Sequence, residues 1–158
     1  ALDGGGSRGV VTLESIRQLQ AYLGGRQVAD CFDIIGGTST GAIIGFLIGL
    51  KRIPTDDAAV MYDSLISRIF VKPKFSTIKT AVTTAQYSSK PFQKILLDIL
   101  GEGSMASSRA DPDVPLVFAV ASKMTSNPTQ LCLFRNYAYE DEGLPPSPSS
   151  PPPPPYSI

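Results

Sequence analysis

Apolar residues recur at helical spacing near the start of the chain. They stand at Val10, Leu13, Ile16, Leu19 and Leu23, which lie on one face of a helix. Two glycines follow directly, as is typical of a helix C-terminus. This pattern predicts an amphipathic helix over residues 10–23.

The next apolar segments lack a polar face. The sequence CFDIIGG (residues 31–37) is too short for a helix and ends in glycine, so it predicts a buried strand. Residues 41–51 are apolar all round, which predicts a helix that is covered on every side. The apolar part of that helix has only about half the length needed to span a bilayer.

The rest of the chain adds two helices and two strands. A turn at residues 53–56 precedes a helix to about Phe70, and Pro91 opens a helix that ends before Gly101. The sequences PLVFAVASKM (115–124) and TQLCLFRNY (129–137) are typical of strands, and their short connection favours an antiparallel pair. Residues 71–89 are polar and poorly periodic, so we expect a loop there.

The order of these elements predicts an α/β fold. Strands and helices alternate, which is typical of three layers: a mainly parallel central sheet with helices on both faces. We expect the folded domain to span residues 1–143. Residues 144–158 contain LPPSPSSPPPPP, which cannot build a core and favours polyproline II, so this segment is predicted to be a disordered tail.

Charge and cysteine content narrow the functional classes. Lys+Arg and Asp+Glu each number 14, and this balance argues against a nucleic-acid partner. The two cysteines form no metal-binding pattern, and we predict no metal and no cofactor. Because the chain opens at Ala1 inside an apparent strand, the true N-terminus is expected to be missing.

Residues 37–41 read GTSTG and match the G-x-S-x-G nucleophile elbow. In this motif a serine lies on a sharp strand-to-helix turn, and Gly37 and Gly41 remove side chains that would clash across it. The N–H groups at the start of the following helix then point toward a developing oxyanion. The motif predicts Ser39 as a nucleophile; the alternative is a glycine-rich turn with an unreactive serine.

A second glycine motif, DGGGSRG at residues 3–9, follows the first predicted strand. Consecutive glycines let backbone N–H groups converge on an anion. We therefore predict an oxyanion hole at Gly4, Gly5 and Gly6, with the amides of Gly5 and Gly6 as donors. Arg8 would add charge or brace the loop through Asp3.

The same glycines allow a competing interpretation. Gly4, Gly6 and Gly9 match G-x-G-x-x-G, the fingerprint of dinucleotide-binding folds. Such a site also requires an acidic residue at the end of the second strand to bind a ribose, and none stands there. No Lys-Ser/Thr pair follows the glycines, which excludes a P-loop. Both glycine motifs instead follow strand ends, so they are expected at one edge of the sheet, where α/β folds place their sites.

The chain contains no histidine, so it cannot form a Ser-His-Asp triad. DGGGSRG followed by GTSTG resembles the patatin-like phospholipase family, and the similarity is strongest over residues 1–51. The resemblance implies that Ser39 is the nucleophile of a Ser-Asp dyad and that Gly4, Gly5, Gly6 and Arg8 form the oxyanion-hole motif. The implied reaction is phospholipase A-type hydrolysis of fatty-acyl esters in phospholipids or neutral lipids, without a metal.

One part of the family pattern is missing. In the family the dyad aspartate lies in a D-G-G or D-G-A motif after the serine, whereas the only Asp-Gly here is Asp3-Gly4. Asp33 is expected too deep in its strand, Asp111 and Asp113 at the opposite edge, and Asp141 in an acidic segment. We therefore predict a C-terminally truncated patatin-like domain, with little or no hydrolysis by this chain alone.

Two other functions stay open at this point. The chain could be a catalytically inactive remnant that binds lipid or an anion, or an interaction module whose proline-rich tail binds an SH3 or WW domain. A lipid substrate implies peripheral contact with a membrane. The expected location is therefore the cytoplasm or a membrane surface.

Overall fold

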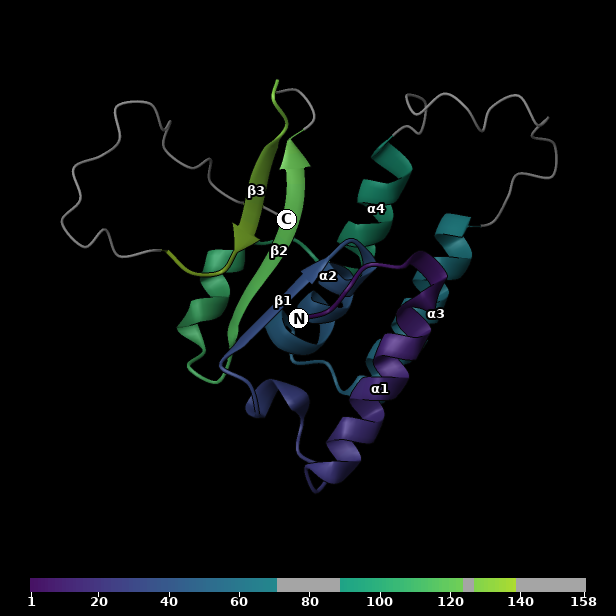
Figure 1. Cartoon of the computed structure of the whole chain (residues 1–158), viewed down its shortest axis with the longest axis vertical. Coiled ribbons are helices and arrows are strands. Elements are labelled where there is room, and N and C mark those ends of the chain that lie inside the picture. The colour runs from purple at the N-terminus through teal and green to yellow at the C-terminus, as the bar shows by residue number, and fades with distance from the viewer. Residues whose placement is uncertain (71–88, 124–126, 139–158) are drawn as a thin grey trace.

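The computed structural model describes residues 1–70, 89–123 and 127–138 (Figure 1). The helices are α1 (Gly9–Tyr22), α2 (Thr40–Gly45), α3 (Thr55–Phe70) and α4 (Ser89–Leu100), and the strands are β1 (Ile34–Thr38), β2 (Leu116–Lys123) and β3 (Gln130–Arg135). Short turns are η1 (Gly6–Arg8), η2 (Val28–Asp30), η3 (Phe46–Leu50) and η5 (Met105–Ala110). The loop predicted at 71–89, apart from Ser89, and the proline-rich tail lie outside the described residues.

The strands form a mixed sheet in the order β1-β2-β3. β1 and β2 are parallel, with Ile34 opposite Leu116, and β2 and β3 are antiparallel, as the short connection predicted. Leu2 adds one parallel bridge on the other side of β1, where its N–H donates to the Gly36 carbonyl oxygen at 2.8 Å. The α/β class is confirmed.

The segment formed by α2 and the π-helical turn η3 lies at the centre of the molecule. Every residue from 40 to 50 except Phe46 is buried, as the all-round apolar sequence predicted. Ile44 and Leu47 are fully buried. The main buried cluster joins this segment to the other helices through Leu13, Ile16, Val28, Ile43, Ile44, Leu47, Ile48, Ala58, Tyr62, Leu65 and Leu100. Two neighbouring layers therefore cover the segment: the sheet, and the helices α1 and α3.

The described helices pack on one face of the sheet. Ile35 and Val117 fill the space beside Gly49 of η3 on that face. On the other face the Phe118 ring lies across Gly36, and Ile34 is 48% exposed. Neither buried cluster of the described residues contains a side chain from this second face. The second helical layer stays a prediction, because the described residues supply helices to one face.

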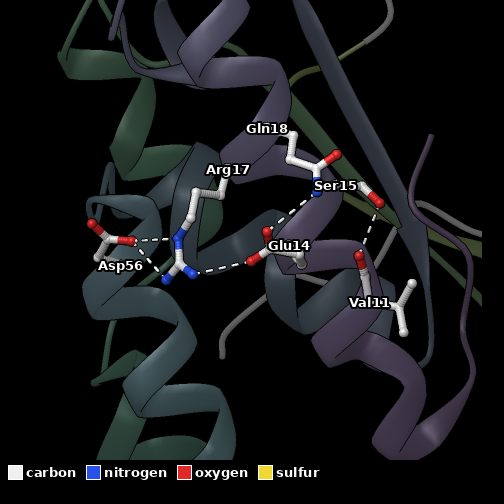
Figure 2. Close-up of polar contacts among 6 residues, drawn as sticks. All are labelled: Val11, Glu14, Ser15, Arg17, Gln18 and Asp56. Atoms are coloured by element: carbon white, nitrogen blue, oxygen red, sulfur yellow. Dashed lines mark hydrogen bonds and ion pairs between the residues drawn. The ribbon is translucent and has the colours of Figure 1, made fainter.

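Helices α1 and α3 lie side by side and are joined at the surface by Arg17 (Figure 2). The Arg17 Nε donates to Asp56 Oδ1 at 2.8 Å, and Nη1 donates to Glu14 Oε2 at 3.0 Å. The pKa of the Arg17 guanidinium is raised first by the hydrogen bond that it donates to Asp56, then by the charge of Asp56, and then by Glu14. Because all three side chains are exposed, water screens the cluster, and its contribution to stability is small.

The helices of this fold are short. Within the described ranges, none combines the length and the hydropathy that crossing a bilayer requires.

Candidate active site at the Ser39 turn

Ser39 lies between the last residue of β1 and the first residue of α2. Its backbone angles are φ 51° and ψ −126°, a conformation that residues with a side chain rarely adopt. Ser39 is exposed, while Thr40 beside it is only 7% exposed. The chain therefore holds an exposed hydroxyl on a strained turn at the carboxyl end of a buried strand.

The glycines on either side of Ser39 permit close backbone packing. A Cβ added to Gly37 would lie 2.6 Å from the carbonyl carbon of Gly41. A Cβ added to Gly41 would overlap the Leu2 carbonyl oxygen and lie 2.6 Å from its carbonyl carbon. The first turn of α2 thus packs directly on the first paired residue of the chain, and this contact brings the two glycine motifs to one edge of the sheet.

The glycine segment is hydrogen-bonded to both neighbours of Ser39. The Gly4 N–H donates to Thr38 Oγ1 at 3.0 Å, and the Gly5 N–H donates to Thr40 Oγ1 at 3.2 Å. A Cβ on Gly4 would lie 2.8 Å from the Cβ of Ser39. Gly4 and Gly5 therefore lie beside Ser39, in the place where the sequence predicts the oxyanion hole.

The backbone amides of this segment differ in their availability. Gly5 must share or release its bond to Thr40 before it can donate to an oxyanion. The Gly6 amide has no hydrogen-bond partner among the described residues. The Arg8 side chain folds back over Gly5, and no ion pair joins it to Asp3 in the described part of the chain. Of the two roles predicted for Arg8, the geometry favours a charge beside the loop.

The carboxylates considered from the sequence lie elsewhere. Asp33 and Asp113 line a cleft of about 730 Å³ together with Arg52. Because Asp33 directly precedes β1 and its carbonyl oxygen accepts from the Leu116 N–H at 2.9 Å, this cleft lies at the amino ends of the parallel strands. Ser39 follows the opposite end of β1. Asp141 lies outside the described residues.

Residues 1–70, 89–123 and 127–138 contain no group of three His, Cys, Asp or Glu side chains that could bind a metal ion. The two cysteines are free thiols and are half-buried.

We expect Ser39→Gly to raise the free energy of unfolding by about 1 kcal/mol relative to Ser39→Ala, because glycine adopts these backbone angles without strain. Both variants remove the hydroxyl, so their difference measures the backbone alone. Urea denaturation followed by circular dichroism gives the two values. Equal stabilities would show that the turn is unstrained.

A family model described as patatin-like phospholipase matches residues 1–145. The calcium-independent phospholipase A2-gamma of Rattus norvegicus is 38% identical over 141 residues, which are 88% of this chain and 18% of the relative. The protein of the same name from Homo sapiens is 36% identical over 141 residues, with the same shares of 88% and 18%.

A plant protein matches at lower identity. Phospholipase A I of Arabidopsis thaliana is 24% identical over an alignment of 160 residues that includes 87% of this chain and 12% of that protein. The chain therefore spans less than a fifth of the length of these relatives.

Proposed function

This chain belongs to the patatin-like phospholipase family, and from that premise we propose that it carries the nucleophile of a lipid acyl hydrolase. The observation that carries the proposal is the strained and exposed Ser39 beside Gly4 and Gly5. An exposed serine hydroxyl on a strained strand-to-helix turn is the arrangement that a nucleophile elbow requires. The substrate is the acyl ester of a phospholipid, as the names of the relatives suggest, or of a neutral lipid, as the resemblance of the two glycine motifs implies.

The reaction that this geometry supports is acyl transfer to serine. Ser39 Oγ attacks the ester carbonyl carbon, and the carbonyl oxygen becomes an oxyanion that accepts hydrogen bonds from the glycine amides. The tetrahedral intermediate then expels the alcohol and leaves an acyl-serine, which water hydrolyses to the free fatty acid and the restored hydroxyl. Loss of one such amide donor typically costs about 3–4 kcal/mol of barrier.

The serine also needs a group that accepts its proton and then donates that proton to the leaving alcohol. We propose a Ser-Asp dyad whose aspartate is not part of this sequence, because the chain has no Asp-Gly after Ser39 and because Asp33 and Asp113 line the opposite edge. Without this base the hydroxyl is a poor nucleophile at neutral pH. The reaction of this chain alone is therefore slow.

We expect a fluorophosphonate to label Ser39 slowly and p-nitrophenyl esters to be hydrolysed at close to the background rate. Mass spectrometry of the digested adduct identifies the labelled residue, and Ser39→Ala is the control for both assays. A folded protein that is not labelled at Ser39 would favour the inactive lipid- or anion-binding remnant. Rapid ester turnover that Ser39→Ala abolishes would show that the chain contains its own base.

Two further predictions depend on parts of the protein beyond this site. Binding of an SH3 or WW domain requires the proline-rich tail, which lies outside the described residues. Peripheral membrane contact follows from the proposed lipid substrate. Binding to phospholipid vesicles measures the membrane contact, and binding of an SH3 or WW domain to the chain with and without residues 144–158 measures the contribution of the tail.

A further inference from the structure

Tyr62 of α3 reaches the glycine segment through its hydroxyl. Its side chain is fully buried, and its hydroxyl donates to the Gly6 carbonyl oxygen at 2.5 Å. Helix α3 lies beside α1, whose N-terminus continues directly from the glycine segment (Figure 1). The ring passes so close to Gly9 that a Cβ there would overlap the hydroxyl and lie 3.0 Å from Cε1. A hydrogen bond thus joins residues 56 positions apart in the chain.

The bond fixes the orientation of one peptide group. The Gly6 carbonyl oxygen also accepts from the Gly9 N–H, so both of its lone pairs are engaged. Because the peptide group is planar, holding this oxygen also sets the direction of the Ser7 N–H, which points the opposite way. Gly6 itself has φ 57°, and the chain turns at this residue.

Three hydroxyl groups therefore hold the glycine segment. Thr38 and Thr40 accept from the amides of Gly4 and Gly5 at the elbow, and Tyr62 donates to the carbonyl of Gly6 from α3. The Gly6 amide lies between these attachments and has no partner among the described residues. It is therefore held in place and free to donate.

We propose that Tyr62 is a positioning residue for the oxyanion hole, because its hydroxyl holds the Gly6 peptide so that the neighbouring amides keep their places beside Ser39. Donors that are fixed before the reaction stabilise a developing charge without reorganising. The effect of Tyr62 on catalysis rests on the proposed function, whereas its effect on the position of the glycine segment does not. Tyr62 itself does not touch the reacting atoms.

The test compares Tyr62→Phe with Leu65→Ala. The first variant removes the hydroxyl and keeps the ring; the second truncates another fully buried side chain of α3 and keeps the bond to Gly6. We expect Tyr62→Phe to lower the maximal rate of fluorophosphonate labelling at Ser39 about tenfold, which is the worth of one hydrogen bond, with an unchanged half-saturating concentration. Leu65→Ala is expected to lower the stability but not this rate.

Amide NMR of the same proteins supplies a readout that needs no reaction. We expect Tyr62→Phe to shift the Ser7 amide signal and to speed the hydrogen exchange of the Gly9 N–H more than that of the other α1 amides. Leu65→Ala should leave the Ser7 signal unchanged and speed the exchange of Gly9 no more than that of the rest of α1. Unchanged signals of both amides in Tyr62→Phe would overturn the proposal, as would a labelling rate equal to that of the wild type. If the wild type is not labelled, the proposed function fails, and the NMR signals alone decide whether Tyr62 holds the loop.

Discussion

Gly41→Ala is expected to lower the free energy of unfolding by about 3 kcal/mol or more, because the added Cβ would overlap the Leu2 carbonyl oxygen. The atoms that it meets belong to the backbone of Leu2 and Asp3, which cannot rotate away as a side chain does. Relief therefore requires that the first segment of the chain move off α2. Urea denaturation followed by circular dichroism measures the loss, and fluorophosphonate labelling of Ser39 should fall with it.

Gly45→Ala is the matched control on the same helix. A Cβ at this position would lie 3.5 Å from Ile35 Cγ2, which is an ordinary van der Waals contact. Since alanine favours a helix more than glycine does, the free energy of unfolding should stay the same or rise by up to about 1 kcal/mol. Equal losses in the two variants would mean that the contact between Gly41 and Leu2 is not the cause.

Gly9→Ala is expected to have an effect of similar size, about 3 kcal/mol, because its Cβ would overlap the Tyr62 hydroxyl. Although Tyr62 is a side chain, it is fully buried, so it could turn only by displacing the core side chains around it. The ring would have to leave the core or break its bond to Gly6. Urea denaturation measures the loss of stability.

A double-mutant cycle with Tyr62→Leu separates this overlap from any general effect on α1. The smaller leucine leaves room for the new Cβ, so Gly9→Ala should cost much less in the Tyr62→Leu background than in the wild type. Additive losses in the two variants would refute a direct clash between Gly9 and Tyr62.

Much of the fold followed from local sequence patterns. The helix predicted at 10–23 is α1, displaced by one residue, and the all-round apolar segment from Gly41 forms the buried centre. The strand predicted at 31–37 begins only at Ile34, because residues 28–30 form the short turn η2, and Cys31 to Asp33 lie between that turn and the strand. Such a turn depends on how the chain enters the sheet, which apolar periodicity does not encode.

Only those parts of the candidate site that depend on neighbouring residues in the chain could be predicted from the sequence. Ser39 and the glycines lie within two short motifs whose residue types suit the turn that each segment makes. The structure places these two motifs side by side. The contribution of Tyr62 could not be predicted, because nothing in the sequence around a helical tyrosine shows which carbonyl it will reach. Thr38 and Thr40 stand inside the motif, yet their partners appear only when the first segment packs on α2.

The packing of Gly37 and Gly41 bears on how inactive members of such a family can be identified. Both glycines are needed for the close backbone packing between β1, α2 and the start of the chain. Selection for folding alone would therefore preserve them after catalysis had been lost. Their presence in a related sequence is therefore poor evidence of activity. The informative position is 39. A glycine there would remove both the hydroxyl and the backbone strain, and so would mark a relative that keeps the fold but no longer catalyses the reaction.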